Sequence, residues 1–204
     1  ADGTVHINED LISNAVGEEH LICSSVSGGK LWQAGSYSPL TQAYFVPLTE
    51  ACNTVAPTQT EFTAGNAVGA VKFGPRVLPE GITDAGLMQA LAVNPTQGES
   101  KWQYRSRPSM TSSVLATAGG LVFGGDAARA VKAWDQETGD VVWSQTLNAP
   151  IGGNPLTDEN DGEQSLAIPT GYSNAASSIS SAFPEIPLPT GSGNSIFVFK
   201  LPKS

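Results

Sequence analysis

Ionisable side chains are scarce in this 204-residue sequence, and those present are unbalanced in sign. Charged residues make up 14% of the chain, and 10 Lys and Arg stand against 19 Asp and Glu, giving a formal net charge of −9. A nucleic acid or an anionic membrane surface requires a positive footprint that this composition does not supply. The sequence therefore predicts no nucleic-acid partner.

Long hydrophobic runs are missing as well. No apolar run approaches the roughly 18 residues needed to span a bilayer. The start of the chain, Ala1–Thr4, is polar and lacks a basic region followed by an apolar one. We expect that any signal peptide was removed or lies on a longer precursor.

Cysteine and histidine occur only twice each. His6 and His20 have no Cys or His at metal-ligand spacing, so they predict no metal site. Cys23 and Cys52 flank a predicted hairpin; they could pair or remain two separate buried thiols. Nucleophile-elbow, P-loop and dinucleotide motifs are all absent, so the residues predict no catalytic group in this segment.

What the chain does have is glycine, proline and apolar residues. Gly (22) and Pro (14) supply 36 of the 204 residues, and 40% of the chain is hydrophobic. This combination favours a turn-rich all-β fold with a substantial core over a helical one.

A repeated turn suggests the architecture. Residues Ala133–Trp143 place a small residue, then Gly at the sixth step and Trp at the tenth, and Ala92–Trp102 repeats this pattern. The two tryptophans are 41 positions apart (143 − 102). A period of this size is typical of four-stranded propeller blades, and we expect both rings to pack between neighbouring blades.

We therefore interpret residues 1–204 as one partial propeller domain. Its strands are placed at about 23–50 with 86–105, at 112–146 for the clearest blade, and at 151–202 for a split last blade, with a long insertion at about 51–85 that has no core of its own. Propellers use about four to eight blades, so about three blades leave an incomplete ring. The ring must be completed by a longer protein or a partner.

One acidic stretch, Asp158–Gly162, lacks the spacing of an EF-hand loop. Its Asp, Asn and Gly residues predict a hairpin turn instead of a calcium site.

Several segments resemble, in the same order, the quinoprotein alcohol dehydrogenases, which bind pyrroloquinoline quinone (PQQ). The repeated turn resembles their tryptophan-docking motif, Ala-x-Asp-x-x-Thr-Gly-x-x-x-Trp. Ser112–Gly124 resembles their G-G-x-L-A-T-A-G-G-L-V-F-x-G strand pair. Residues Cys23–Trp32, with Tyr37–Pro39 and Tyr44–Pro47, resemble their C-P-x-x-x-G-G-K-N-W…Y-N-P…Y-V-P region, and Ser195–Pro202 resembles their last propeller strand.

The resemblance implies an eight-bladed propeller of which this chain is the C-terminal portion. It implies oxidation of a small alcohol to an aldehyde with PQQ, assisted by Ca²⁺ or a lanthanide, in a periplasmic or secreted enzyme. The catalytic aspartate and the metal ligands of relatives precede the matching segment, so no residue here inherits those roles. The implied partners are the remaining N-terminal blades and a periplasmic electron acceptor such as a cytochrome c.

The resemblance also identifies candidate site residues. It places Lys30, Leu31 and Trp32 beside the cofactor, although relatives usually have Asn at the position of Leu31. It places Met110 on the pocket wall, where relatives often have Trp. It also implies a Cys23–Cys52 disulfide.

The departures at Leu31 and Met110 motivate a second hypothesis, a non-catalytic propeller module that has lost PQQ binding. A third is a repeat protein that self-associates through its open edges.

Overall fold

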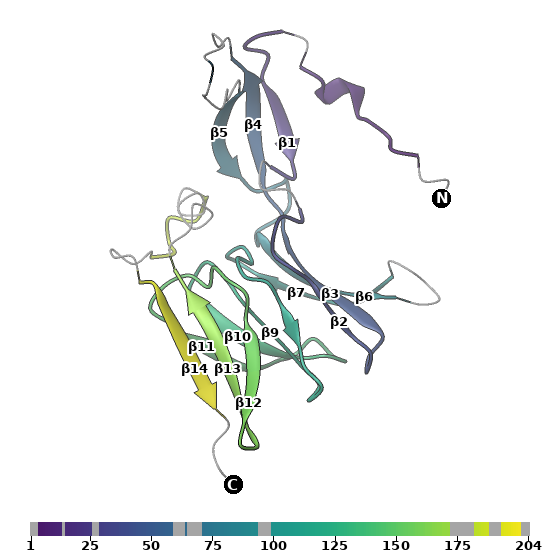
Figure 1. Ribbon diagram of the computed structural model, residues 1–204. Coiled ribbons are helices and arrows are strands. Elements are labelled where there is room, and N and C mark those ends of the chain that lie inside the picture. The colour runs from purple at the N-terminus through teal and green to yellow at the C-terminus, as the bar shows by residue number, and fades with distance from the viewer. Residues whose placement is uncertain are drawn as a thin grey trace.

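A computed structural model describes residues 4–13, 15–25, 29–58, 64, 71–93, 99–171, 182–187 and 193–200. Its strands form four antiparallel sheets (Figure 1). Three of them stack side by side in chain order, and we call these the first, second and third blades. The fourth, which we call the side sheet, stands apart from the stack. The predicted all-β fold with about three blades is confirmed.

The first blade has the strand order β2-β3-β6-β7. Its strands are β2 (Ser36–Ser38), β3 (Ala43–Thr49), β6 (Gly86–Ala92) and β7 (Ser100–Ser106). The sequence predicted two hairpins here, and the structure joins them because β3 pairs with β6 along its whole length. The turn of the first motif copy, residues 94–98, lies outside the described residues.

The side sheet forms within the segment expected to be a long insertion. Strands β4 (Cys52–Pro57) and β5 (Val71–Val77) lie between β3 and β6 in the chain and pair with β1 (His20–Cys23) in the order β1-β4-β5. No strands are predicted from the sequence at 51–85. Apolar residues do not alternate in β4, which is defined by its two neighbours in the sheet. They alternate in β5, but Gly74 and Pro75 at its centre weaken the local strand signal.

The second blade has the four strands expected from the sequence, in the order β11-β10-β9-β8. They are β8 (Leu115–Ala116), β9 (Leu121–Gly125), β10 (Ala130–Asp135) and β11 (Val141–Thr146). Local turn chemistry joins them. Gly120 turns with a φ of +80°, and the Asp135 carboxylate accepts the backbone N–H groups of Glu137 and Thr138 at 2.9 and 3.0 Å.

The third blade has three strands in its described residues, β12 (Leu156–Asn160), β13 (Glu163–Thr170) and β14 (Ser195–Lys200). The turn between β12 and β13 contains fewer residues than the predicted turn at Asp158–Gly162. It consists of Asp161 and Gly162, both with positive φ (53° and 76°), as a two-residue type I′ hairpin requires.

Two apolar clusters hold the blades together. The first joins the first and second blades and includes Phe45, Met88, Trp102, Val122 and Trp134; the second joins the second and third blades and includes Val131, Ile151, Leu166 and Ile168. Complete burial of one such side chain contributes roughly 1.5–3 kcal/mol. The second blade is therefore covered on both faces.

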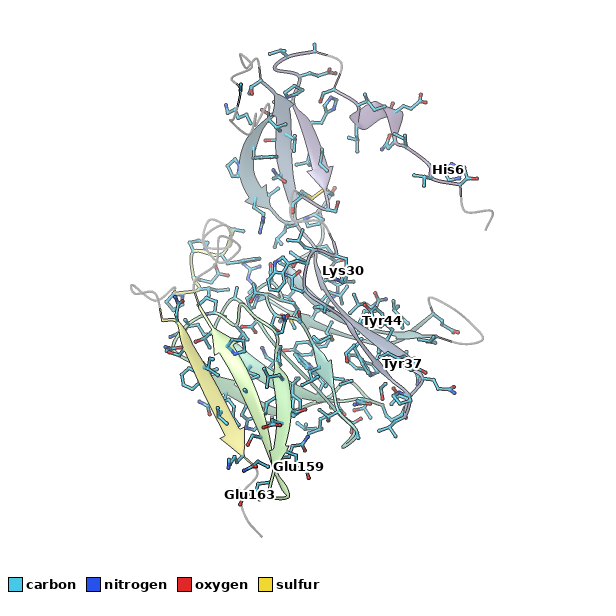
Figure 2. The ribbon with its side chains drawn as sticks, in the orientation of Figure 1. His6, Lys30, Tyr37, Tyr44, Glu159 and Glu163 are labelled. Atoms are coloured by element: carbon cyan, nitrogen blue, oxygen red, sulfur yellow. A yellow bond between two sulfur atoms is a disulfide. The ribbon has the colours of Figure 1, made fainter. Side chains whose placement is uncertain are left out.

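The two outer blades each leave one face bare. Tyr37 and Tyr44 are a directly opposed cross-strand pair on the free face of the first blade (Figure 2) and are 51% and 36% exposed. On the free face of the third blade, Ile196 and Val198 are 73% and 60% exposed. Exposed apolar faces of this kind are typical of surfaces that contact further protein.

Candidate functional site

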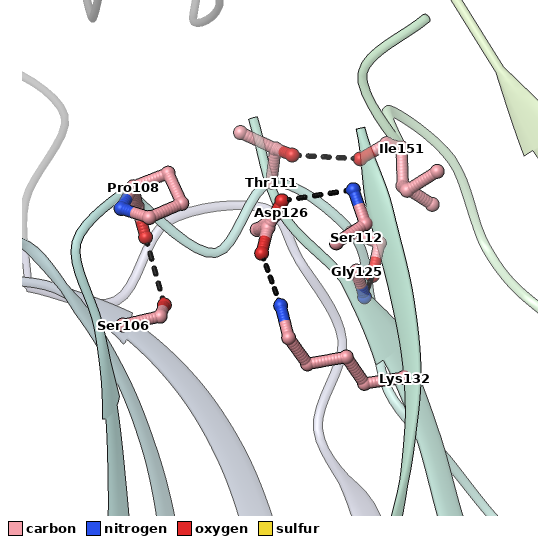
Figure 3. Close-up of polar contacts among 9 residues, drawn as sticks. Ser106, Pro108, Thr111, Ser112, Gly125, Asp126, Lys132 and Ile151 are labelled. Atoms are coloured by element: carbon pink, nitrogen blue, oxygen red, sulfur yellow. Dashed lines mark hydrogen bonds and ion pairs between the residues drawn. The ribbon is translucent and has the colours of Figure 1, made fainter. Parts of the chain in front are cut away.

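The connection between the first and second blades is a buried polar segment, residues 106–113 (Figure 3). The Ser106 hydroxyl donates to the Pro108 carbonyl at 2.9 Å, and the Thr111 hydroxyl donates to the Ile151 carbonyl at 2.8 Å. The Ser112 hydroxyl oxygen accepts the N–H of Gly125 at 2.7 Å. These bonds fix the segment to the second blade and to the chain that enters the third.

A buried ion pair lies beside this segment. Lys132 Nζ contacts Asp126 Oδ2, with the two side chains 13% and 2% exposed, and Asp126 Oδ1 accepts the Ala130 N–H at 3.1 Å. Both carboxylate oxygens are thus engaged within the second blade. Asp126 is therefore committed to structure, and it is not a free general base.

Met110 lies in the core between the first and second blades. It is 2% exposed, belongs to the cluster that contains Trp102 and Trp134, and forms an isolated β-bridge with Asp126. The neighbouring Ser109 hydroxyl is buried and has no hydrogen-bond partner within the described part of the chain. A role for Met110 beside a cofactor stays a prediction.

Lys30 lies where the side sheet joins the first blade (Figure 2), and Leu31 and Trp32 follow it in the chain between β1 and β2. Lys30 Nζ donates to the Leu31 carbonyl at 2.9 Å and to the Gln33 carbonyl. No carboxylate among the described residues pairs with this ammonium. The Leu31 and Trp32 side chains are 45% and 51% exposed.

The end of this stretch is tied to the second blade. The Ala34 N–H donates to Ser113 Oγ at 2.8 Å, and the Val114 N–H donates to the Ala34 carbonyl at 3.0 Å. Two residues further on, Ser36 Oγ accepts the Ala116 N–H at 3.0 Å. Sequence reasoning did not single out Ser113. Its signal was present, because Ser112 and Ser113 occupy the Gly-Gly positions of the motif that Ser112–Gly124 resembles.

The predicted disulfide is present. Cys23 and Cys52 are directly opposed on β1 and β4, with their Cα atoms 4.1 Å apart and their sulfurs bonded. The bridge closes a loop of 29 residues in sequence separation that contains Lys30–Trp32 and the β2–β3 hairpin. It therefore fixes the side sheet at the point where the chain enters and leaves the first blade.

The two motif tryptophans pack against the following blade. Trp102 Nε1 donates to the Gln136 carbonyl at 2.9 Å, and its ring lies directly over Gly139. Trp143 meets Phe199 of the third blade edge to face, with ring centroids 5.1 Å apart. Both positions are structural, as the sequence suggested.

A groove of about 530 Å³ lies between the second and third blades, away from the predicted site residues. Phe123, Trp143, Leu166 and Phe199 are among its lining residues, and Lys200 is the only ionisable one among those that the structure describes. The described lining of the groove is therefore mainly apolar surface.

The described residues contain no group of three or more His, Cys, Asp or Glu arranged to hold a metal ion. Within the same part of the chain, no helix is long and apolar enough to cross a membrane.

Comparisons with known proteins agree with the fold. A family model described as outer membrane protein assembly factor BamB matches residues 88–162. The quinoprotein ethanol dehydrogenase of Pseudomonas putida is 30% identical over 175 residues, covering 86% of this chain and 27% of that protein. The 1-butanol dehydrogenase (quinone) of Thauera butanivorans is 29% identical over 188 residues, covering 92% of this chain and 29% of that protein.

A solved structure, a europium-containing methanol dehydrogenase, matches with a TM-score of 0.79 at 24% identity, over 91% of this chain and 36% of that one. The stacked blades therefore define part of a β-propeller. Its sequence relatives are quinoprotein alcohol dehydrogenases, and the chain spans little more than a quarter of the length of the two named above.

Proposed function

We propose that this chain is the C-terminal portion of a quinoprotein dehydrogenase that oxidises alcohols to aldehydes with PQQ. Its share is to complete the propeller and to form one wall of the cofactor pocket. The observation that supports this most directly is the match of three consecutive blades to one segment of the dehydrogenase relatives. In this proposal the repeated turn is a tryptophan-docking motif that joins blades of an eight-bladed ring.

Lys30 and Trp32, between the side sheet and the first blade, fit a flat, anionic quinone. Trp32 presents a half-exposed indole, and aromatic faces stack on planar rings. Lys30 carries an ammonium that no described carboxylate neutralises, in a chain of net charge −9, so a ligand carboxylate would find a positive partner there. Leu31 would contribute apolar contact alone.

When bound, PQQ supplies the two-electron acceptor for the hydride of the alcohol. Lys30 and Trp32 would hold one side of it, and Met110 would support that wall from the core behind it. The ligands of Ca²⁺ or a lanthanide, and the base that takes the hydroxyl proton, would come from the remaining N-terminal blades.

The same proposal covers location and partners. The Cys23–Cys52 disulfide suits an oxidising compartment, so we place the protein in the periplasm or outside the cell. The reduced cofactor would pass electrons to a periplasmic acceptor such as a cytochrome c. The bare faces of the outer blades would contact the rest of the propeller.

A second candidate is a propeller module without catalysis. Two observations favour it: Leu31 has no side-chain hydrogen-bonding group, and Met110 is 2% exposed in the core. In that case the pocket would be filled by side chains.

Reconstitution with PQQ and Ca²⁺ separates the two candidates. The intact protein should keep quinone absorbance after desalting and should reduce a dye in the presence of an alcohol. The 204-residue chain under the same conditions should show no turnover, because the acid–base and metal groups are supplied elsewhere. An intact protein that retains no quinone would favour the non-catalytic module.

A further inference from the structure

Ser113 connects the entry segments of all three blades. The residue is 3% exposed, and its hydroxyl oxygen accepts the N–H of Ala34, just before the first blade. Its O–H donates to Asn154 Oδ1, and its own N–H donates to the Gly153 carbonyl at 3.2 Å, just before the third blade. One buried serine thus contacts residues 79 and 41 positions away in sequence.

The hydroxyl uses its donor and one acceptor site at once. The bond to Asn154 fixes the direction of the O–H, which leaves an oxygen lone pair aimed at the Ala34 N–H. The Ala34 carbonyl is held as well, by the Val114 N–H at 3.0 Å. Both peptide groups that flank Ala34 are therefore clamped to the second blade.

The same stretch is held at its other end by Lys30. Its ammonium donates to the Leu31 and Gln33 carbonyls, which folds the chain around it, and the Gln33 side chain is buried. Trp32 lies between these two anchors with half of its surface exposed. An exposed indole without the anchors would sample many positions.

We propose that Ser113 is a positioning residue for the cofactor wall: its hydroxyl clamps Ala34 and thereby holds Trp32 in place for a planar quinone. This inference rests on the proposed function. Ser113 does not contact the ligand. It acts by ordering residues 30–34 before binding, so that the ligand does not bear the entropic cost of ordering them. A Gly at this position, as in the related motif, would lack the hydroxyl that forms the clamp.

The test uses three variants of the intact protein that contains this chain. Ser113→Ala removes both side-chain bonds. Asn154→Ala removes only the acceptor that orients the hydroxyl. Ser112→Ala is the matched control, because this adjacent serine is equally buried but its hydroxyl bonds Gly125 and the Ser113 carbonyl within the second blade.

Two measurements are made on each apoprotein: hydrogen exchange of a peptide covering residues 30–36, and the Kd for PQQ by calorimetric titration. For Ser113→Ala we expect faster exchange in this peptide and an affinity about tenfold weaker, equivalent to one hydrogen bond. For Asn154→Ala, both the exchange rate and the Kd should lie between those of the parent and those of Ser113→Ala. Ser112→Ala should change the affinity less than about twofold.

The outcomes distinguish this inference from the proposed function. If the parent binds PQQ and Ser113→Ala binds it no more weakly than Ser112→Ala, the positioning role is wrong while the proposed function stands. Faster exchange with an unchanged Kd also overturns it, because the clamp is then only structural. A parent protein that binds no PQQ overturns the proposed function, and this inference with it.

Discussion

The indole N–H of Trp102 donates to the carbonyl of Gln136 at 2.9 Å, while the Trp102 ring covers Gly139 three residues further along the same turn. Trp102 lies on β7 of the first blade, and Gln136 and Gly139 lie between β10 and β11 of the second. One side chain therefore satisfies a polar group and fills an apolar space of the neighbouring blade.

Gly139 is needed in this contact for two separate reasons. Its φ is +78°, and a Cβ there would lie 2.6 Å from Trp102 Cδ2. Left-handed backbone costs a non-glycine residue roughly 1–2 kcal/mol, and overpacking adds roughly 1–3 kcal/mol. We expect Gly139→Ala to lower the free energy of unfolding by about 2–5 kcal/mol in urea denaturation.

Gly120 offers the matched control for that substitution. Its φ is +80°, but a Cβ there would meet nothing within 4 Å. Gly120→Ala should therefore lose only the backbone contribution, about 1–2 kcal/mol. If both variants lose the same free energy of unfolding, the close approach of Trp102 does not contribute to the cost of Gly139→Ala.

The Asp126–Lys132 pair should be the most sensitive ion pair among the described residues, because it is the most buried. Lys132→Met leaves the carboxylate buried without its cation, and breaking such a pair costs about 3–5 kcal/mol. Lys200→Met removes the exposed contact with Glu163 and should cost less than about 1 kcal/mol. Urea denaturation of both variants checks this, and similar midpoints would contradict it.

Removal of the disulfide should destabilise the protein measurably. Cys23→Ser with Cys52→Ser frees a loop of 29 residues in sequence separation, for which the chain-entropy model gives about 3–4 kcal/mol. Thermal unfolding should show a lower Tm in the double variant, and a reductant should lower the parent's Tm but leave the variant's unchanged. A parent that does not respond to full reduction would refute the expectation.

The turn at Asp135 should contribute a small pH dependence. The backbone N–H groups of Thr138 and then Glu137 donate to its carboxylate and lower the pKa of Asp135. A pKa lowered on folding adds stability that is present above the ordinary value near 3.9 and is lost as pH falls through the folded value. The effect is small because the carboxyl is exposed to solvent.

Asp135→Asn keeps the turn's acceptor oxygen but does not titrate. The stability difference between parent and variant should be largest near pH 6 and should shrink as pH is lowered toward 2.5, when measured by urea denaturation across that range. A difference that stayed constant with pH would exclude the carboxylate as its origin.

The parts of the fold that were predictable from sequence are those fixed by neighbours in the chain. The second blade was predicted strand by strand, since its turns carry Gly120, Asp135 and Gly139 at positions that demand them. The pairing of β3 with β6 was not predicted, because 36 residues separate Thr49 from Gly86 and no local signal spans them. Strands β4 and β5 were missed for the same reason, since β4 is defined by its pairing with β1 and β5.

The candidate site was predictable only in part. The resemblance identified Lys30, Leu31 and Trp32, and the structure describes their surroundings without testing their role. Ser113 departs visibly from the Gly of the related motif, but that departure does not reveal the contacts with residues 34 and 154 from which its importance comes.

The second blade is supported by packing on both faces, whereas each outer blade is supported on one. The free energy of local unfolding is lowest where few apolar contacts must be broken. Under heat or denaturant the stack should therefore loosen from its two ends toward the middle, and the 121–146 segment should be the last to lose its order. A partner that covers the free faces would suppress this local unfolding. It would raise the stability of the whole stack without contacting the second blade.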